Sequence, residues 1–257
     1  MSGTIRFQVV DNLKRLSSAV GPFENAETTV NVFYVDLACL ASIAPILSDE
    51  EHERSKRFCR DSARSSFQSS RTALRLILSQ LLATTPDGIS IRYGKFGKPH
   101  LDGDFSDWKF NISRSAGKAL IACAYQKDVG IDLEQRRDLD ELGLAQRYFS
   151  RPEFLKLRSL DESLRNHAFF DCWALKEAFV KSLGLGLHMP LDQFEVNFNS
   201  NSMQQALKRC NRAPDLVNQC FLSPLPLEDA DYSAAIAIHD AKITDQSWRI
   251  FNATASI

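Results

Sequence analysis

The order of helical and strand-like segments limits the possible folds of this chain more than any other feature. Helical patterns gather in two blocks, near residues 49–83 and 150–183, and short strand-like segments follow each block. A doubly wound parallel sheet would require strands and helices to alternate along the chain. The segregated order therefore predicts an α+β fold with two similar successions of elements.

Local signals place the segments of the first succession. Val30–Leu37 is rich in β-branched and aromatic residues, which predicts a strand. Ser48 followed by Glu51 has the form of a capping box, so a charged helix begins there, and a second helix covers about Asp61–Ala83. The strand-like segments that follow are Ile89–Tyr93, Lys109–Ser113, Lys118–Tyr125 and Val129–Glu134.

The second succession carries similar signals. Ser150 with Glu153 repeats the capping-box form, and a long helix over about Glu162–Leu183 ends before Gly184. The later strand-like segments are Phe194–Phe198, Tyr232–His239 and Trp248–Phe251. No low-complexity linker separates the two successions, so we expect any two subdomains to pack closely.

Charge and composition exclude several classes of protein. The net charge of -1 gives no global field that would attract nucleic acid or an anionic membrane, so any anion site must be local. No segment approaches the roughly 20 apolar residues of a membrane span, and the first residues lack a signal-peptide core, which predicts a cytoplasmic protein. The scattered cysteines form no C-x-x-C pair and read as reduced, mostly buried thiols.

The hexapeptide Val129–Glu134 is the first candidate for chemistry. The two-residue period of a strand places Asp132 and Glu134 on one face, away from Val129, Ile131 and Leu133. Two neighbouring carboxylates raise each other's pKa unless a cation neutralises them, and a hard divalent ion does this well. A solvated acidic face on an edge strand is the alternative interpretation.

The segment Trp173–Lys181 is the second candidate. Helical spacing puts Trp173, Glu177 and Lys181 on adjoining positions of one face, so an acid and a base project beside an aromatic ring. The alternative is an exposed Glu-Lys pair four residues apart, with the tryptophan in the core.

Basic residues suggest an anion site. Arg64, Arg71 and Arg75 fall within roughly 40° of one another on the helix after Asp61, a stripe that would suit a phosphate or pyrophosphate. A solvated face with carboxylate partners is the alternative. The tight turn Gly94–Pro99 would aim Lys98, and Phe110–Gly117 supplies Ser113 and Arg114, although either could be an ordinary surface turn.

Taken in order, these motifs resemble the 4'-phosphopantetheinyl transferase superfamily, and in particular its larger monomeric subclass that activates peptide and polyketide synthetases. The resemblance spans about Leu47–Leu187. It rests on Leu47-Ser48, Arg57-Phe58, Arg71–Arg75, Gly97-Lys98-Pro99, Phe110–Ser113, Val129–Glu134 and Trp173–Lys181.

The resemblance implies two α+β halves related by a pseudo-twofold axis, with residues 1–128 binding the phosphates of coenzyme A and residues 129–257 carrying a Mg²⁺ site. It also implies coenzyme A and Mg²⁺ in the cleft between the halves. By motif position the metal ligands are Asp132, Glu134 and Glu177, with Glu177 also a candidate base and Lys181 neutralising the leaving group. The implied coenzyme A contacts are Arg54, Arg71, Lys98, Ser113, Arg114 and Lys181.

The resemblance also implies the reaction, that of a holo-[acyl-carrier-protein] synthase type of enzyme. A serine of an apo carrier protein attacks the phosphorus bonded to pantetheine, and adenosine 3',5'-bisphosphate leaves. The implied protein is a monomer that engages neither nucleic acid nor membrane. A carrier-protein surface is expected near Arg136 and Arg137, because the carrier helices are acidic.

One position departs from the family pattern. Relatives usually carry His after the serine of the F-N-x-S motif, and here that residue is Arg114. Arginine keeps a donor and a fixed positive charge, so we expect phosphate binding to survive while rate and pH dependence change.

Two other functions stay open at this stage. A degenerate homologue could bind coenzyme A or a carrier protein without catalysis, although the complete set Asp132, Glu134, Glu177 and Lys181 argues against it. A different magnesium enzyme that hydrolyses a nucleotide pyrophosphate is a more distant alternative, because no P-loop is present.

Overall fold

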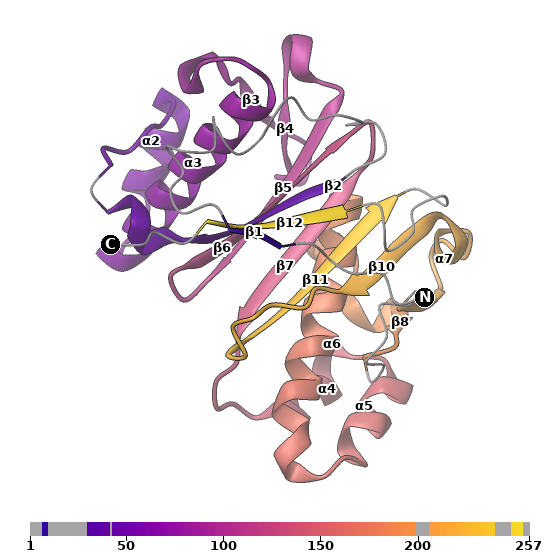
Figure 1. Cartoon of the computed structure of the whole chain (residues 1–257). Coiled ribbons are helices and arrows are strands. Elements are labelled where there is room, and N and C mark those ends of the chain that lie inside the picture. Colours follow the sequence, from indigo (N-terminus) through magenta and orange to yellow (C-terminus); the bar gives the residue numbers. More distant parts are fainter. Residues whose placement is uncertain (1–6, 10–29, 42, 199–205, 240–247, 254–257) are drawn as a thin grey trace. The chain divides into compact units, whose positions relative to one another are not determined.

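The computed structural model describes residues 7–9, 30–41, 43–198, 206–239 and 248–253 (Figure 1). Contacts divide the chain into two units: unit 1 comprises 1–92, 99–126 and 247–257, and unit 2 comprises 93–98 and 127–246. This partition differs from a single division after residue 128 in three segments, because 93–98 and 127–128 lie with unit 2 and 247–257 with unit 1.

Unit 1 contains a mixed sheet in the order β1-β12-β2-β6-β5. Strands β2 and β12 are parallel, whereas β6 runs antiparallel to both β2 and β5. The helices of this unit are α2 (Asp49–Lys56) and α3 (Asp61–Leu81). The strands are β1 (Phe7–Val9), β2 (Val30–Asp36), β5 (Trp108–Ser115), β6 (Lys118–Tyr125), β12 (Trp248–Ala253) and the small pair β3 (Ile91–Tyr93) and β4 (Pro99–Leu101).

Helix α3 covers one face of the unit 1 sheet with an apolar stripe. Leu74, Ile77, Leu78 and Leu81 recur at helical spacing and are buried together with sheet residues such as Phe110. Burying each such side chain contributes about 1.5–3 kcal/mol, so the stripe fixes which side of α3 meets the sheet.

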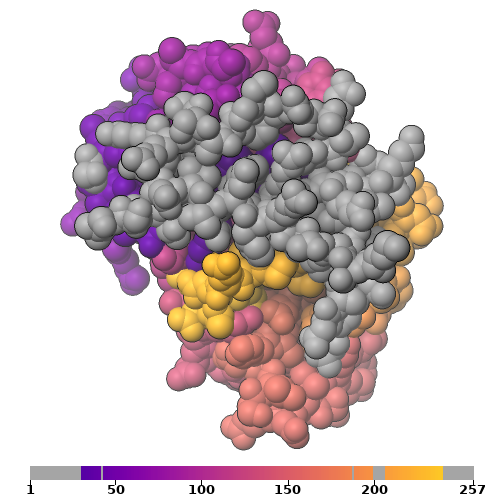
Figure 2. Space-filling model, viewed as in Figure 1, coloured from indigo at the N-terminus to yellow at the C-terminus, as the bar shows by residue number. Residues whose placement is uncertain are grey.

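Unit 2 is a second α+β assembly, in which an antiparallel sheet in the order β10-β11-β7 packs against α6. Side chains fill the space between α4, α5 and α6, the salmon helices of Figures 1 and 2. The helices are α4 (Glu141–Tyr148), α5 (Arg151–Arg158), α6 (Glu162–Leu183) and α7 (Leu216–Gln219). The strands are β7 (Val129–Gln135), β8 (Phe194–Val196), β9 (Leu207–Cys210), β10 (Cys220–Pro224) and β11 (Tyr232–His239).

The predicted α+β class is confirmed, and so are the predicted bounds of α6. The relation of the halves by a pseudo-twofold axis stays a prediction. Within the described ranges, no helix is long and apolar enough to cross a membrane.

Strand β7 and helix α6 approach each other most closely at Gly130. A Cβ added there would lie 2.1 Å from the carbonyl oxygen of Ala178 and 2.3 Å from the backbone nitrogen of Ser182. Contacts this short with backbone atoms leave no room for a side chain. Glycine at this position therefore sets the distance between the strand and the helix.

A buried ion pair fixes α6 on its other side. Lys176 is fully buried, and its ammonium lies 2.8 Å from Glu153 Oε2 and donates to the carbonyls of Leu191 and Phe194, each at 2.8 Å. Glu153 accepts from the backbone N–H groups of Ser150 and Val196. Every charge in the pair is thus hydrogen-bonded, which is the condition for burying it at acceptable cost.

We predict that Gly130→Ala lowers the free energy of unfolding by about 1–3 kcal/mol or more, because β7 must move away from α6. Urea denaturation monitored by circular dichroism measures the change. Gly94→Ala is the matched control, since the added Cβ would meet nothing nearer than 3.6 Å. Equal stability losses in the two variants would contradict the close-packing argument.

Candidate functional site

Asp132 and Glu134 lie on the β7 face that meets α6. Asp132 is buried, and its Oδ1 is 2.5 Å from the Lys181 ammonium on α6. The pairing of β7 with β11 sets Asp132 opposite Ala235 and Glu134 opposite Ser233, so a methyl and a hydroxyl lie beside the two carboxylates. The structure therefore joins the acidic strand and the basic end of the helix into one cluster.

The carboxylates of this cluster influence one another. Burial and the charge of Asp132 raise the pKa of Glu134 to about 7, against the opposing effect of Arg137 and Lys181. Burial and Asp132 likewise raise the pKa of Glu177, which Lys181 again opposes. Lysine thus compensates only part of the negative charge that the fold gathers here.

The chemistry of these donors fits a hard divalent cation. Carboxylate oxygens are the ligands that Mg²⁺ takes in proteins, and added positive charge would relieve the repulsion among Asp132, Glu134 and Glu177. In the part of the chain that the structure describes, however, no three His, Cys, Asp or Glu side chains already converge as a metal site. The fit therefore rests on charge and donor type.

Trp173 belongs to the core of unit 2. Its ring centroid lies 5.7 Å from that of Phe169, 6.0 Å from that of Tyr148 and 6.2 Å from that of Phe149. The alternative interpretation of this residue, a partly buried packing role, is therefore correct. The tryptophan helps to orient the helix that presents Glu177 and Lys181.

Lys98 lies at the C-terminal end of α6. Its ammonium donates to the carbonyl oxygen of Ser182 at 2.7 Å and is 3.7 Å from Asp128 Oδ1. The turn that carries it is closed by a bond from the Gly94 N–H to the Lys98 carbonyl. Gly184 ends α6 in a left-handed conformation, φ 67°, and an added Cβ there would meet the Lys98 side chain at 3.0 Å.

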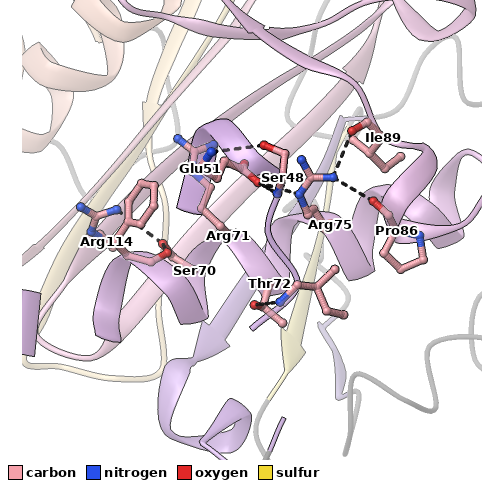
Figure 3. A network of polar contacts seen from close by, with 11 residues as sticks. Ser48, Glu51, Ser70, Arg71, Thr72, Arg75, Pro86, Ile89 and Arg114 are labelled. Carbon is pink, nitrogen blue, oxygen red and sulfur yellow. Dashed lines mark hydrogen bonds and ion pairs between the residues drawn. The ribbon is translucent and has the colours of Figure 1, made fainter. Parts of the chain in front are cut away.

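Glu51 organises the arginines of unit 1 (Figure 3). Its Oε2 accepts from Ser48 N–H at 3.0 Å, and Ser48 Oγ accepts from Glu51 N–H at 3.2 Å, so the predicted capping box is confirmed. Arg75 Nε donates to the same Oε2 at 2.7 Å, and its Nη1 donates to the carbonyls of Pro86 and Ile89. Arg75 is therefore a buried structural residue.

The predicted phosphate stripe is wrong for two of its three arginines. Arg75 is occupied by Glu51, and Arg64 donates to Asp61 at 2.9 Å and to the carbonyl of Phe58 at 3.0 Å. Carboxylate partners, the alternative interpretation, explain both residues. Arg71 differs, because its Nε is 3.9 Å from Glu51 and its guanidinium lies 5.5 Å from the Phe67 ring centroid.

Arg114 approaches the same aromatic ring from β5. Its guanidinium lies 5.4 Å from the Phe67 centroid and 5.9 Å from that of Phe58, and Nη1 donates to Ser70 Oγ at 3.4 Å (Figure 3). Although the residue as a whole is exposed, desolvation at the rings, with the charges of Arg71 and Arg54, lowers its pKa. Arg71 and Arg114 thus share the Phe67 ring, and the charge of Arg54 also acts on Arg114, an arrangement of like charges that favours an anionic ligand.

Ser113 does not join this group. Successive residues of a strand point to opposite faces, and Arg114 shares the α3 face of the sheet with Ile112 and Phe110. Ser113 is buried on the other face, opposite Leu120 of β6. The structure therefore separates two neighbours that the sequence motif places side by side.

The two arginines after β7 have different environments. Arg136 donates to Ser233 Oγ at 3.1 Å, lies 3.5 Å from Asp171, and also donates to the Ala230 carbonyl. Arg137 is 59% exposed and lies 3.7 Å from Glu134. Both arginines were expected at a carrier-protein surface. Arg136 instead holds the turn before β11, whereas the guanidinium of Arg137 is exposed.

No sequence pattern pointed to Ser182 and His239, which lie beside Lys98. The Ser182 hydroxyl donates to the Phe179 carbonyl at 2.7 Å, and its Oγ is 2.9 Å from His239 Nε2. The two residues are 57 positions apart, so only the packing of β11 on α6 reveals the pair.

Comparisons with known proteins identify the family to which the chain is similar. The family model described as the 4'-phosphopantetheinyl transferase superfamily matches residues 128–237. The 4'-phosphopantetheinyl transferase HetI of Nostoc sp. is 36% identical over 160 residues, which cover 61% of this chain and 67% of the relative. The 4'-phosphopantetheinyl transferase Sfp of Bacillus subtilis is 29% identical over 205 residues, which cover 75% and 88%.

A solved structure of Thermotoga maritima holo-[acyl-carrier-protein] synthase matches 46% of this chain and 66% of its own, with 22% identity and a TM-score of 0.34, too low to carry an argument. The matched family segment contains Asp132, Glu134, Glu177 and Lys181, the cluster that β7 and α6 bring together. On the family model and the identity to HetI, the chain belongs to the 4'-phosphopantetheinyl transferase superfamily.

Proposed function

We propose that this protein transfers the 4'-phosphopantetheine group of coenzyme A to a serine hydroxyl of an apo carrier protein, with Mg²⁺, and releases adenosine 3',5'-bisphosphate. The observation that carries the proposal is the coupled cluster of Asp132, Glu134, Glu177 and Lys181 in the segment that the family model matches. Family membership supplies the reaction class, and the cluster supplies groups suited to it.

Asp132, Glu134 and Glu177 are the residues that would hold the metal. A bound Mg²⁺ would supply charge stabilisation at the pyrophosphate oxygens. Asp132 is the most firmly placed of the three, because it is buried and its Oδ1 lies 2.5 Å from Lys181. The raised pKa values of Glu134 and Glu177 mark the two carboxylates that gain most from a neighbouring cation.

Glu177 is the proposed proton acceptor. In the reaction the carrier serine Oγ forms a bond to the phosphorus of the phosphopantetheine group, the bond from that phosphorus to the bridging oxygen breaks, and the hydroxyl proton goes to the Glu177 carboxylate. Lys181 offsets the negative charge that develops on the departing phosphate.

The remaining proposed contacts to coenzyme A are grouped by unit. In unit 1, Arg54, Arg71 and Arg114 form the cationic group beside Phe67, and they would bind phosphate through guanidinium forks. Ser113 stays a proposed contact by motif position, on the opposite face of the sheet. In unit 2, Lys98 would direct one N–H at a phosphate while α6 holds another.

We further propose that the protein acts as a cytoplasmic monomer on acyl or peptidyl carrier domains. A homologue that binds coenzyme A or a carrier without catalysis is the competing function. The two are separated by product formation, because an accessory protein would bind coenzyme A without forming a holo carrier.

We predict that the purified protein, given coenzyme A and Mg²⁺, adds the mass of phosphopantetheine to at least one apo carrier protein in intact-mass spectrometry. Glu177→Gln should lower the rate by about 10²-fold or more, because the proposed base is removed. Glu162→Gln is the matched control, an exposed carboxylate at the start of the same helix. Coenzyme A binding without product on any carrier would favour the accessory protein.

We predict that Mg²⁺ raises the thermal unfolding midpoint of the wild type and that Asp132→Asn abolishes this increase. At about 100 times its dissociation constant, a ligand of the native state adds about 2.7 kcal/mol of stability. Scanning fluorimetry with and without Mg²⁺ measures the shift. Asp104→Asn serves as the control at an exposed site. An equal increase in Asp132→Asn would place the ion elsewhere.

We predict that Arg114→His makes coenzyme A affinity depend on pH more steeply than in the wild type. Arginine stays charged, whereas imidazole loses its proton as the pH rises through about 6.5, so the variant should lose affinity on the alkaline side. The expected extra loss is roughly tenfold, the contribution of one charged hydrogen bond. Calorimetry at several pH values gives the ratio of the two dissociation constants, and a constant ratio would contradict a phosphate contact at Arg114.

A further inference from the structure

A polar group that the proposed reaction does not use surrounds Lys98 in unit 2. It consists of Ser182 on α6, His239 at the end of β11, and Asp128, whose carbonyl accepts from His239 N–H at 2.9 Å. Ser182 contributes twice, because its carbonyl oxygen accepts from the Lys98 ammonium and its hydroxyl meets His239 Nε2 at 2.9 Å. Three distant segments of the chain therefore converge on one lysine.

The hydrogen bonds assign the direction of the Ser182–His239 contact. A serine hydroxyl has one proton, and that of Ser182 goes to the Phe179 carbonyl at 2.7 Å. With that proton used, Ser182 Oγ accepts from the His239 tautomer that carries its hydrogen on Nε2, and the Cys220 thiol is a further hydrogen-bond neighbour of the same hydroxyl. Burial lowers the pKa of His239, against the effect of Asp128 and with that of Lys98, which favours the neutral ring.

The ammonium of Lys98 lies where the last carbonyls of α6 collect negative charge. Helix C-termini stabilise cations, and the Ser182 carbonyl receives one of the three ammonium hydrogens. Gly184 leaves just enough room for the lysine stem, since an added Cβ would be 3.0 Å from it. Because the Lys98 ammonium is hydrogen-bonded to the Ser182 carbonyl, a movement of Ser182 would also move the lysine.

Cys220, the other titratable group at this position, adds no charge. It pairs with His239 across β10 and β11, and burial raises the pKa of its thiol to about 12. The charges that face His239 are thus those of Lys98 and Asp128.

We infer that Ser182 and His239 are positioning residues for Lys98, which they hold against the end of α6 so that its ammonium faces a phosphate of coenzyme A. This inference rests on the proposed function, because Lys98 is a coenzyme A contact only there. The pair acts through the Ser182 backbone. His239 fixes the Ser182 side chain, and the Ser182 carbonyl fixes the ammonium.

The test measures the dissociation constant of coenzyme A by calorimetry, together with KM and kcat, in His239→Leu and His239→Gln. Leucine removes the donor to Ser182 Oγ, and we expect KM and the dissociation constant to rise roughly three- to tenfold, because Lys98 must be ordered on binding. The value of kcat should change little, since the chemistry lies elsewhere. Glutamine keeps an N–H donor and should restore most of the affinity.

A double-mutant cycle separates positioning from general stability. In a Lys98→Ala background, His239→Leu should cost no further affinity, because the side chain it positions is gone. Ile238→Val, a buried change next to His239, is the matched stability control and should leave KM unchanged.

An unchanged KM in His239→Leu, or an equal loss with and without Lys98, would overturn the inference. If the wild type binds coenzyme A but transfers nothing to any carrier, the proposed function fails and the binding cycle still decides the positioning role. If the wild type does not bind coenzyme A at all, both are overturned.

Discussion

The contact of β7 with α6 at Gly130 is the constraint on which the cluster of Asp132, Glu134, Glu177 and Lys181 depends. Because the added atom of any other residue would lie within 2.1 Å of the Ala178 carbonyl, only glycine allows strand and helix to touch here. Two residues later on the strand, Asp132 then reaches Lys181 from across the same interface. Close packing thus turns an unremarkable acidic strand and a common Glu-Lys helix face into one coupled site.

Each unit secures its long helix with the same device. In each unit a short helix begins with a serine that is followed three residues later by a glutamate. That glutamate forms an ion pair with a buried cation on the next long helix of the unit, Glu51 with Arg75 and Glu153 with Lys176. The separations along the chain, 24 and 23 residues, are nearly equal. Removing one partner of such a pair typically costs about 3–5 kcal/mol, so each glutamate matters well beyond its own helix cap.

The same ion pair in both units is a structural counterpart of the two similar successions of helices and strands in the sequence. No residue-by-residue repeat is visible, yet both units join a capping glutamate to a cation on a long helix. The cations differ in how they are satisfied. Arg75 donates to the carbonyls of Pro86 and Ile89, and Lys176 to those of Leu191 and Phe194, so each also anchors the segment that follows its helix.

Patterns of local spacing predicted most of the helices and strands, because helical periodicity, strand alternation and helix caps depend on only a few neighbouring residues. The bounds of α6 and β11 follow directly from such signals. Strands β9 and β10 and helix α4 were not predicted, since their short, mixed sequences carry no clear period.

Contacts between distant residues could not be predicted in this way. The arginine spacing on α3 was correct, but it could not show that Glu51 occupies Arg75, nor could the F-N-I-S motif show that Ser113 and Arg114 lie on opposite faces. Lys98 and Ser182 are 84 positions apart, so their bond exists only in the folded protein.

The distribution of charge follows from these buried pairs. In unit 1, Glu51 is engaged chiefly by Arg75, and Arg71 and Arg114 bring positive charge to the Phe67 ring. In unit 2, Lys181 lies against Asp132 and Arg137 lies 3.7 Å from Glu134, yet the pKa values of Glu134 and Glu177 stay raised, so this group is acidic on balance. The acidic group of unit 2 therefore suits a cation, whereas the arginines of unit 1 suit an anion, so each unit gathers charge of one sign at one place.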